Sequence, residues 1–329
     1  MTSTQSSSST STVTILDDYQ QVALGYTDWT PVTDRFTLDV VTEHIADTDE
    51  LVERLAGSEI VVAMRERTPF PASTLERLPE LKLLITTGMH NASIDVAAAG
   101  RLGVVVCGTG GAGNAMPELT IGMILAITRH LAEEDAAVRR GEWQHTVGTG
   151  LAGRTLGVVG LGQLGIPVAK LARAFDMRVI AWSPNLTAER AAEHGVTAVS
   201  RQDLFATADV VTIHMPLSDR SRGLIGADDL AEMKPTAYLV NNSRGPIVDE
   251  PALVAALRTR RIAGAALDVY DVEPLPVDHI LRTLPNTLLL PHIGYVTTDA
   301  YAVFYADAVA DIVAYLAGEP VRILAPMAR

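Results

Sequence analysis

Residues 153–165 read GRTLGVVGLGQLG, in which a short apolar run ends in the glycine spacing G-x-G-x-x-G. A helical pattern follows over residues 163–175, and a second apolar run occupies residues 177–182. A strand, a glycine-rich turn, a helix and a second strand in this order are typical of a βαβ unit that binds a dinucleotide. We therefore expect an α/β protein whose parallel sheet extends outward from this unit.

Each position of the glycine turn has a physical role in such a site. Gly160 permits the tight turn, Gly162 lets the backbone approach a pyrophosphate, and Gly165 lets the helix pack closely on the strand. The backbone N–H groups at the start of the helix, around Gln163 and Leu164, would hold the phosphate charge. These residues are the first predicted cofactor contacts.

The second strand of such a unit normally ends in an Asp or Glu that binds the ribose hydroxyls. Here Ser183 holds that place, within Trp182-Ser183-Pro184-Asn185. No carboxylate would repel a 2′-phosphate, but no arginine follows at once to attract one, and Arg190 lies a few residues further along the chain. Both NAD and NADP are therefore compatible with the sequence.

The same glycine spacing occurs a second time, at Gly108–Gly113. An apolar run precedes it and a helical pattern follows, but position 133, about 20 residues on, lies inside that helix rather than in a second strand. We interpret this loop as a hinge, or as a loop that lines a cleft.

The chain has 329 residues, 48% of them hydrophobic, and a formal net charge of -13. Its length predicts about two domains. An acidic surface repels nucleic acid and anionic membranes, so neither is an expected partner, and an anionic substrate would need local positive charge. No run approaches the roughly 18 apolar residues of a membrane span.

Cys107 is the single cysteine, so the chain forms no internal disulfide, and its apolar neighbours favour a small core residue over a nucleophile. Residues 1–12 are nearly all Ser and Thr, lack the features of a secretory signal, and are expected to form a disordered tail. We expect a cytoplasmic protein. The eight histidines show no metal-ligand spacing, so no metal is expected.

Ten short apolar runs alternate with helical patterns, at 13–16, 60–64, 81–85, 104–106, 156–159, 179–182, 210–213, 237–240, 264–267 and 287–290. Continuous apolar runs are typical of parallel strands covered on both faces, and ten strands are too many for one compact sheet. We expect a doubly wound fold in two domains, joined near residues 108–117. A helix over 117–140, apolar around much of its circumference, should be buried between domains or subunits, and a last helix over 299–316 should pack on the first domain.

Three polar side chains follow apolar runs in the second half of the chain. Arg244 follows 237–240, Glu273 lies beyond 264–267, and His292 follows 287–290. In a doubly wound sheet ligands bind beyond the carboxyl ends of the strands. Histidine can deliver a proton near neutral pH, a carboxylate can stabilise the imidazolium, and an arginine fork can hold a carboxylate substrate. The set fits hydride transfer to a 2-oxo acid.

Other candidates are less specific. His214 follows the run 210–213, and its context Met215-Pro216-Leu217 indicates a loop beside the cofactor. Arg65 and His90 follow apolar runs in the first half, where a position facing a cleft and a position on the surface are both open.

These motifs, in this order, resemble those of the D-isomer-specific 2-hydroxyacid dehydrogenase family. The resemblance runs from about residue 45 to residue 320 and rests on GRTLGVVGLG at 153–162, HMPL at 214–217, NSRGPIVDE at 242–250, ALDV at 266–269 followed by Glu273-Pro274, and PHIG at 291–294. It implies a Rossmann-like dinucleotide domain over 116–294 and a flavodoxin-like substrate domain formed by 13–115 and 295–329. It also implies a homodimer joined through the helix near 117–140.

The resemblance assigns roles to the polar residues at the strand ends. Arg244 would bind and orient the substrate, and His292, paired with Glu273, would be the acid–base. Asp268 would contact the nicotinamide carboxamide, and Ser243 would contact the cofactor.

It also implies roles for two loops. His214 and Pro216 would complete the cofactor-binding set. The backbone around Thr87, Gly88 and Met89 would hold the substrate carboxylate.

The sequence departs from the family pattern at three places: Ser183 for the usual Asp, Tyr295-Val296 where small residues are usual, and Met89-His90 in the substrate loop. The main expectation is a reductase of a 2-oxo acid such as glyoxylate or hydroxypyruvate. A 3-phosphoglycerate dehydrogenase is an alternative, and nothing points to a formate or phosphite dehydrogenase. A nicotinamide-sensing protein related to co-repressors is the alternative from a different class.

Overall fold

The computed structural model describes residues 11–111, 113 and 115–325. The chain divides into two compact units, one formed by Met1–Ala112 with Val296–Arg329 and the other by Gly113–Tyr295. The predicted tail over 1–12 lies outside the described residues except at its end, where the prediction is wrong because Thr12 already pairs in the first strand.

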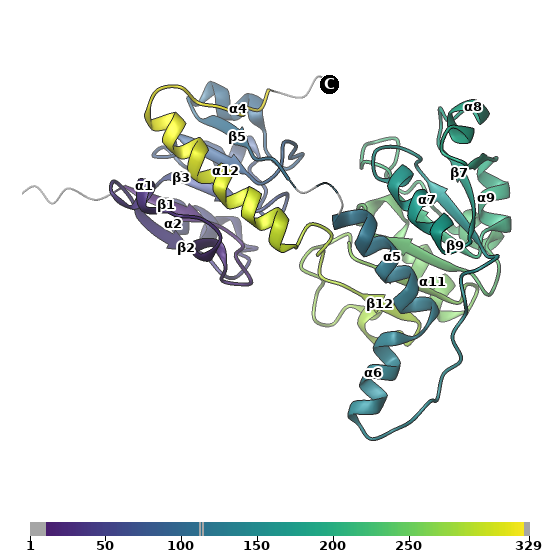
Figure 1. The fold of residues 1–329 in the computed structure, drawn as a ribbon. Coiled ribbons are helices and arrows are strands. Elements are labelled where there is room, and N and C mark those ends of the chain that lie inside the picture. Colours follow the sequence, from purple (N-terminus) through teal and green to yellow (C-terminus); the bar gives the residue numbers. More distant parts are fainter. Residues whose placement is uncertain (1–10, 112, 114, 326–329) are drawn as a thin grey trace, which may run out of the picture. The chain divides into compact units, whose positions relative to one another are not determined.

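The unit over 113–295 is built on seven parallel strands in the order β12-β11-β10-β9-β6-β7-β8 (Figure 1). The strands are β6 Thr155–Val159, β7 Arg178–Trp182, β8 Thr197–Ala198, β9 Val210–Ile213, β10 Tyr238–Asn241, β11 Gly264–Leu267 and β12 Thr287–Leu289. Strand order reverses between β6 and β9, which is the switch point of a Rossmann-like sheet. The predicted doubly wound fold is confirmed.

Helices cover both faces of this sheet, and each face has its own apolar core. The helical segments of the unit are α5 Ala115–Thr128, α6 Leu131–Arg139, α7 Gly165–Ala174, α8 Ala188–Ala192, α9 Arg201–Thr207, α10 Ala227–Glu232, η2 Gly245–Ile247, α11 Glu250–Arg258 and η3 Ile280–Thr283. Side chains of α5 and α7 line one core, and those of α9, α10 and α11 line the other. Burial on both faces explains why the strands read as continuous apolar runs.

The helix predicted over 117–140 is two helices, so this prediction is wrong in detail. Thr128 ends α5: its hydroxyl donates back to the carbonyl of Ile124, and its own carbonyl accepts the backbone N–H of Thr149 instead of continuing the helical ladder. His130 then adopts a left-handed conformation, with φ of 53°, before α6 begins. The apolar α5 packs against α7, β10 and β11 of its own unit, whereas α6 projects from it (Figure 1).

The other unit is a five-stranded parallel sheet in the order β2-β1-β3-β4-β5, the flavodoxin-like order. Its elements are β1 Thr12–Ile15, η1 Ala23–Gly25, α1 Thr30–Thr33, β2 Thr37–Val40, α2 Thr48–Leu55, β3 Ser58–Ala63, α3 Ala72–Leu75, β4 Leu83–Thr86, α4 Val96–Arg101, β5 Val105–Gly108 and α12 Thr298–Leu316. The C-terminal helix α12 contacts α1 and β4. The expected core position of Cys107 is confirmed: it is fully buried, and burial raises the pKa of its thiol to about 12.

Ten strands coincide with the predicted apolar runs, and two were missed. β2 has a partly exposed pattern, and β8 is only two residues long. Both lie at sheet edges, where one side of a strand faces solvent and the apolar signal is weak. Among the described residues no helix is both long and apolar enough to span a membrane.

Candidate active site

The glycine turn lies at the carboxyl end of β6, at the switch point of the sheet. Gly160 has φ of 100°, and a Cβ there would lie 2.6 Å from the carbonyl oxygen of His214. A Cβ on Gly165 would lie 2.2 Å from the carbonyl oxygen of Gly160, so the helix start packs directly on the turn. By contrast, a Cβ on Gly162 would meet no atom within 4 Å. The turn therefore offers bare backbone to open space, which fits a pyrophosphate.

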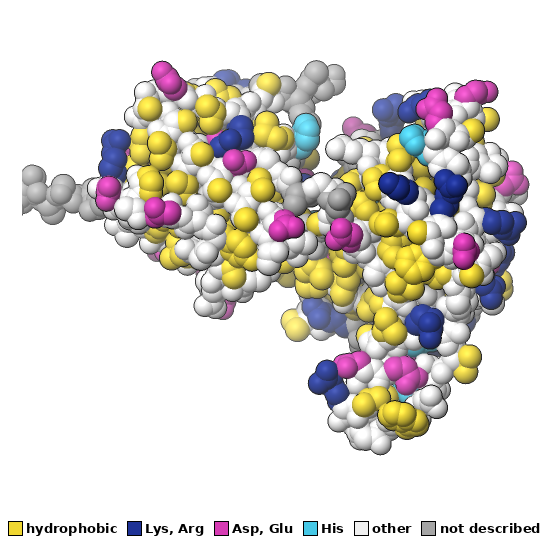
Figure 2. Space-filling model, viewed as in Figure 1, with side chains coloured by type: hydrophobic (Ala, Val, Ile, Leu, Met, Phe, Trp, Pro, Cys, Tyr) yellow, Lys and Arg dark blue, Asp and Glu magenta, His cyan; other side chains and the backbone are white. Residues whose placement is uncertain are grey.

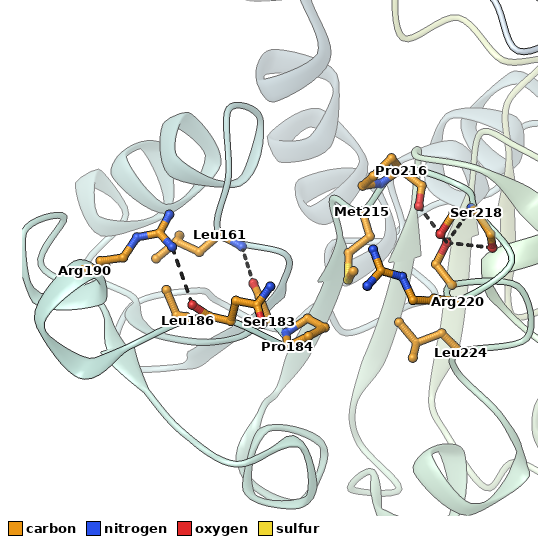
Figure 3. Close-up of a pocket in the computed structure, with 12 residues that line it drawn as sticks. Leu161, Ser183, Pro184, Leu186, Arg190, Met215, Pro216, Ser218, Arg220 and Leu224 are labelled. Atoms are coloured by element: carbon orange, nitrogen blue, oxygen red, sulfur yellow. Dashed lines mark hydrogen bonds between the residues drawn. The ribbon is translucent and has the colours of Figure 1, made fainter. Parts of the chain in front are cut away.

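Ser183 directly follows β7, and its hydroxyl oxygen accepts the backbone N–H of Leu161 at 3.1 Å. This hydrogen bond ties the end of β7 to the glycine turn. Ser183 and Leu161 share a pocket with Pro216 (Figure 3). The residue predicted to contact the ribose therefore lies beside the predicted phosphate loop.

His214 directly follows β9 and has a buried, neutral side chain. Burial lowers the pKa of its imidazole to about 4, and Nε2 lies 3.1 Å from the hydroxyl of Thr212. No described residue hydrogen-bonds to Nδ1. In the following loop the Met215 carbonyl accepts the Ser243 hydroxyl at 2.6 Å, and the Pro216 carbonyl accepts the hydroxyl of Ser221 at 2.7 Å. Hydrogen bonds thus tie the segment from His214 to Pro216 to its surroundings, and the His214 carbonyl lies beside Gly160 of the glycine turn.

His292 and Glu273 form a close pair, with Nδ1 of the histidine 2.5 Å from Oε2 of the glutamate. The second oxygen of Glu273 accepts the backbone N–H of Tyr270 at 2.9 Å, which fixes the carboxylate. His292 has φ of 54°, an uncommon and strained conformation for a residue with a side chain. Both side chains are partly exposed, so the pair can reach a ligand.

Asp268 anchors the loop that carries His292. It is completely buried at the end of β11, and its two oxygens accept the backbone N–H groups of Ile293 at 2.8 Å and Gly294 at 3.0 Å. Burial raises the pKa of its carboxyl to about 6, while these N–H groups and His292 oppose the rise. The backbone that directly follows the imidazole is therefore positioned by a carboxylate that has no exposed surface.

Arg244 follows β10 in an extended conformation. Its carbonyl accepts the side-chain N–H of Asn241 at 3.0 Å, and its guanidinium donates to the Ser243 carbonyl at 2.7 Å. A Cβ on the next residue, Gly245, would lie 2.1 Å from the carbonyl carbon of Tyr270, so the loops after β10 and β11 are in close contact. Because β10, β11 and β12 are adjacent and parallel, the loops with Arg244, Glu273 and His292 leave the same edge of the sheet.

The predicted substrate loop belongs to the other unit. Thr87 is fully buried, and Gly88 has φ of 88° and donates its backbone N–H to the hydroxyl of Thr109 at 2.8 Å. The guanidinium of Arg65 donates to the Thr87 carbonyl at 3.2 Å. A Cβ on Gly88 would collide with this guanidinium. Arg65 therefore braces this loop. Met89 is 41% exposed beside it.

His90, the remaining candidate of this unit, follows the same loop and is exposed. Within the described parts of the chain no group of three or more His, Cys, Asp or Glu side chains could hold a metal ion.

Residues 121–294 match the family model described as "D-isomer specific 2-hydroxyacid dehydrogenase, NAD binding domain". The chain belongs to this family. It is 37% identical to a glyoxylate reductase of Thermofilum pendens, over 75% of this chain and 76% of that protein. A solved structure of a phosphoglycerate oxidoreductase from Vibrio cholerae is similar, with a TM-score of 0.89, 36% identity, and 94% and 99% of the two chains covered.

The chain is also 38% identical to a D-3-phosphoglycerate dehydrogenase of Synechocystis, over 79% of this chain but only 48% of that protein. It spans about half the length of the D-3-phosphoglycerate dehydrogenases that it matches.

This member of the 2-hydroxyacid dehydrogenase family differs from the usual pattern next to the acid–base candidate. The ring of Tyr295 meets that of His292 edge-on, with centroids 6.0 Å apart and planes at 70°. The aromatic ring of Tyr295 therefore lies beside the imidazole of His292.

Sequence reasoning missed several residues that hold the site together. Tyr270 donates its hydroxyl to the Leu290 carbonyl at 2.9 Å and so links the ends of β11 and β12. Asn241 supports Arg244, and Arg220 joins Ser183 in the pocket of Figure 3. For Tyr270 and Asn241 the signal was present, because both stand inside the motifs at strand ends. For Arg220 there was none, because it lies in an unpatterned loop.

Proposed function

We propose that this protein is an oxidoreductase that transfers a hydride between NAD(P)H and a small 2-oxo or 2-hydroxy acid. The observation that carries the proposal is the His292–Glu273 pair. The loops that hold this pair leave the sheet at the same edge as the loop with Arg244. The same unit contains a glycine turn that fits a pyrophosphate. The bound nicotinamide would supply the hydride in reduction and accept it in oxidation.

The side chains would manage charge and protons. As the carbonyl carbon of a 2-oxo acid receives the hydride, its oxygen needs a proton, which the His292 imidazolium donates. Glu273 holds Nδ1, so that Nε2 is the atom that exchanges the proton, and stabilises the charged ring. Arg244 binds the substrate carboxylate with its planar fork and polarises the carbonyl. In the reverse direction neutral His292 accepts the hydroxyl proton.

We also assign the residues that would bind the cofactor and the substrate. The turn at Gly160, Gly162, Gln163, Leu164 and Gly165 would hold the pyrophosphate, with Ser183, His214, Pro216 and Ser243 lining the rest of the cofactor site. The backbone of Thr87, Gly88 and Met89 would bind the substrate carboxylate. Asp268 was predicted to contact the nicotinamide carboxamide; its complete burial and its two backbone hydrogen bonds support a positioning role for His292.

The substrate we favour is a small 2-oxo acid such as glyoxylate or hydroxypyruvate. The resemblance to a glyoxylate reductase supports a small substrate. The ring of Tyr295, which lies beside His292, also favours a small substrate over a large one. A 3-phosphoglycerate dehydrogenase is the second candidate, because several similar proteins carry that name.

The test is to mix the purified protein with NADH or NADPH and a panel of glyoxylate, hydroxypyruvate, pyruvate and 3-phosphohydroxypyruvate, and to follow absorbance at the nicotinamide band. We expect oxidation with at least one unphosphorylated acid. Tight cofactor binding without oxidation by any acid would contradict catalysis and favour a nicotinamide-sensing protein. A strong preference for the phosphorylated acid would favour the second candidate.

We also propose a homodimer joined through the segment that includes α5 and α6. Apolar side chains of α6 and the loop after it are exposed, among them Val138 at 52%, Trp143 at 77% and Val147 at 92%. Figure 2 places apolar side chains at the tip of this projection. A cytoplasmic location is proposed on the single cysteine, which is buried and unpaired.

A further inference from the structure

A pocket of about 290 Å³ lies beyond the carboxyl end of β7 (Figure 3). Arg190 reaches it from α8, and Arg220 reaches it from the loop after β9 on the opposite side. Its other polar side chains belong to Ser183, Asn185, Ser218 and Ser221. None of the residues lining this pocket is an Asp or a Glu.

Its position identifies the part of a cofactor that it would meet. In a dinucleotide-binding unit the end of the second strand faces the adenosine ribose. Ser183 stands at that point, and its hydrogen bond to the Leu161 N–H fixes it against the glycine turn. A carboxylate here would repel a ribose phosphate and favour bare hydroxyls, whereas a serine hydroxyl is neutral and can donate to a phosphate oxygen.

The positive charges of Arg190 and Arg220 are available to bind an anion. Among the described residues, Arg190 donates to the carbonyl of Asn185 at the long distance of 3.5 Å, and neither Arg190 nor Arg220 forms an ion pair. Arg201, by contrast, is engaged by Asp229 at 2.6 Å. In a chain with a net charge of -13, two arginines that face one pocket and have no acidic partner in the described parts of the chain create local positive charge for an anion.

We propose that this pocket binds the 2′-phosphate of NADP, so that the enzyme prefers NADPH to NADH. The proposal rests on the function proposed above. A phosphate monoester carries close to two negative charges at neutral pH, and it matches two guanidinium groups and a serine hydroxyl. NADH would leave both arginines without a partner and would lose these charge-assisted hydrogen bonds.

Isothermal titration calorimetry with cofactor fragments tests the pocket without turnover. We expect 2′,5′-ADP to bind at least tenfold more tightly than 5′-AMP, and NADPH at least tenfold more tightly than NADH. Arg190→Ala and Arg220→Ala should each weaken 2′,5′-ADP about tenfold, equivalent to about 1.4 kcal/mol, while 5′-AMP changes less than twofold. Arg222→Ala is the matched control, because Arg222 is exposed and lies outside the pocket. It should change neither ligand.

Ser183→Asp provides an independent reading, because it adds a negative charge where the phosphate would lie. It should reverse the preference toward 5′-AMP and NADH. Equal or tighter binding of 5′-AMP and NADH by the unmodified protein would overturn the NADP assignment, even if oxo acids are still reduced. Equal losses of both fragments in the two arginine variants would also overturn it. Absence of binding by either dinucleotide would overturn the proposed function as well.

Discussion

Nδ1 of His292 lies 2.5 Å from Oε2 of Glu273, although 19 positions separate the two residues in the chain. The strands that precede them, β12 and β11, are neighbours in the sheet, and this adjacency brings the two loops together. A carboxylate so close to one ring nitrogen fixes the orientation of the imidazole, and in the proposed reaction the other nitrogen exchanges the proton.

Removal of the imidazole should therefore abolish proton transfer but not cofactor binding. We expect His292→Ala to lower kcat by roughly 10²–10⁴-fold, with the Kd for NADPH changed less than threefold. Stopped-flow kinetics and fluorescence titration measure the two quantities. A loss of NADPH affinity as large as the loss of kcat would mean that His292 supports the fold rather than the chemistry.

Loss of the negative charge on Glu273 should lower kcat less than loss of the His292 imidazole does. Glu273→Gln is expected to lower kcat by roughly 10–100-fold and to change the pH profile of kcat, because a charge-assisted hydrogen bond is lost. Glu250→Gln is the matched control, since Glu250 also pairs with a histidine, His279, at 3.0 Å. The control should keep full activity; a similar loss in both variants would indicate a structural effect.

The planar fork of Arg244 should matter more than its charge. Arg244→Ala should lower kcat/KM by roughly 100-fold, and Arg244→Lys should recover only part of this loss because a lysine cannot bind a carboxylate bidentately. Steady-state kinetics over a range of 2-oxo acids measures the effect, with Arg258→Lys on the exposed end of α11 as control. Full activity of the lysine variant would argue against bidentate binding.

Asp268 should act through the position of His292. Asp268→Asn places an N–H₂ group against one of the two backbone N–H donors, so one buried hydrogen bond is lost and the 292–294 loop shifts. We expect kcat to fall by roughly 10–100-fold. Asp249→Asn, an exposed cap of α11 that an asparagine can replace, should be neutral. An altered pH profile of kcat separates this positioning role from simple destabilisation.

Asp311 on α12 should make the stability of its unit depend on pH. Burial raises the pKa of its carboxyl to about 7, and the charge of Arg322 opposes the rise. The carboxyl of Asp311 therefore binds its proton more tightly in the folded state than in the unfolded state, where its pKa is 3.8. Its contribution to the free energy of unfolding is complete below pH 3.8 and is lost as the pH rises through about 7. Asp311→Asn should therefore flatten the decline in melting temperature between roughly pH 5 and pH 8. Labelling of Cys107, buried in the same unit, reports local opening. Parallel melting curves in the two proteins would contradict the assignment.

Much of the candidate site was predictable from single motifs. Arg244, Glu273 and His292 each follow an apolar run, and parallel strands present their carboxyl ends at one edge. The break at His130 was not predictable, because it depends on the Thr149 N–H reaching the Thr128 carbonyl from a distant loop. Nor was the partnership of Arg190 and Arg220, which comes from two segments that meet only across the sheet edge.

The sequence by itself determined the two parallel sheets, the glycine turn and the identity of the polar residues at the strand ends. These features depend on apolar periodicity and on glycine positions, which are local properties of the chain. Only the tertiary structure decided that Asp268 holds the His292 loop and that Arg190 and Arg220 face the Ser183 pocket, whose lining includes no Asp or Glu. Such contacts join residues from different strands and loops, and their distances are set by packing rather than by spacing along the chain.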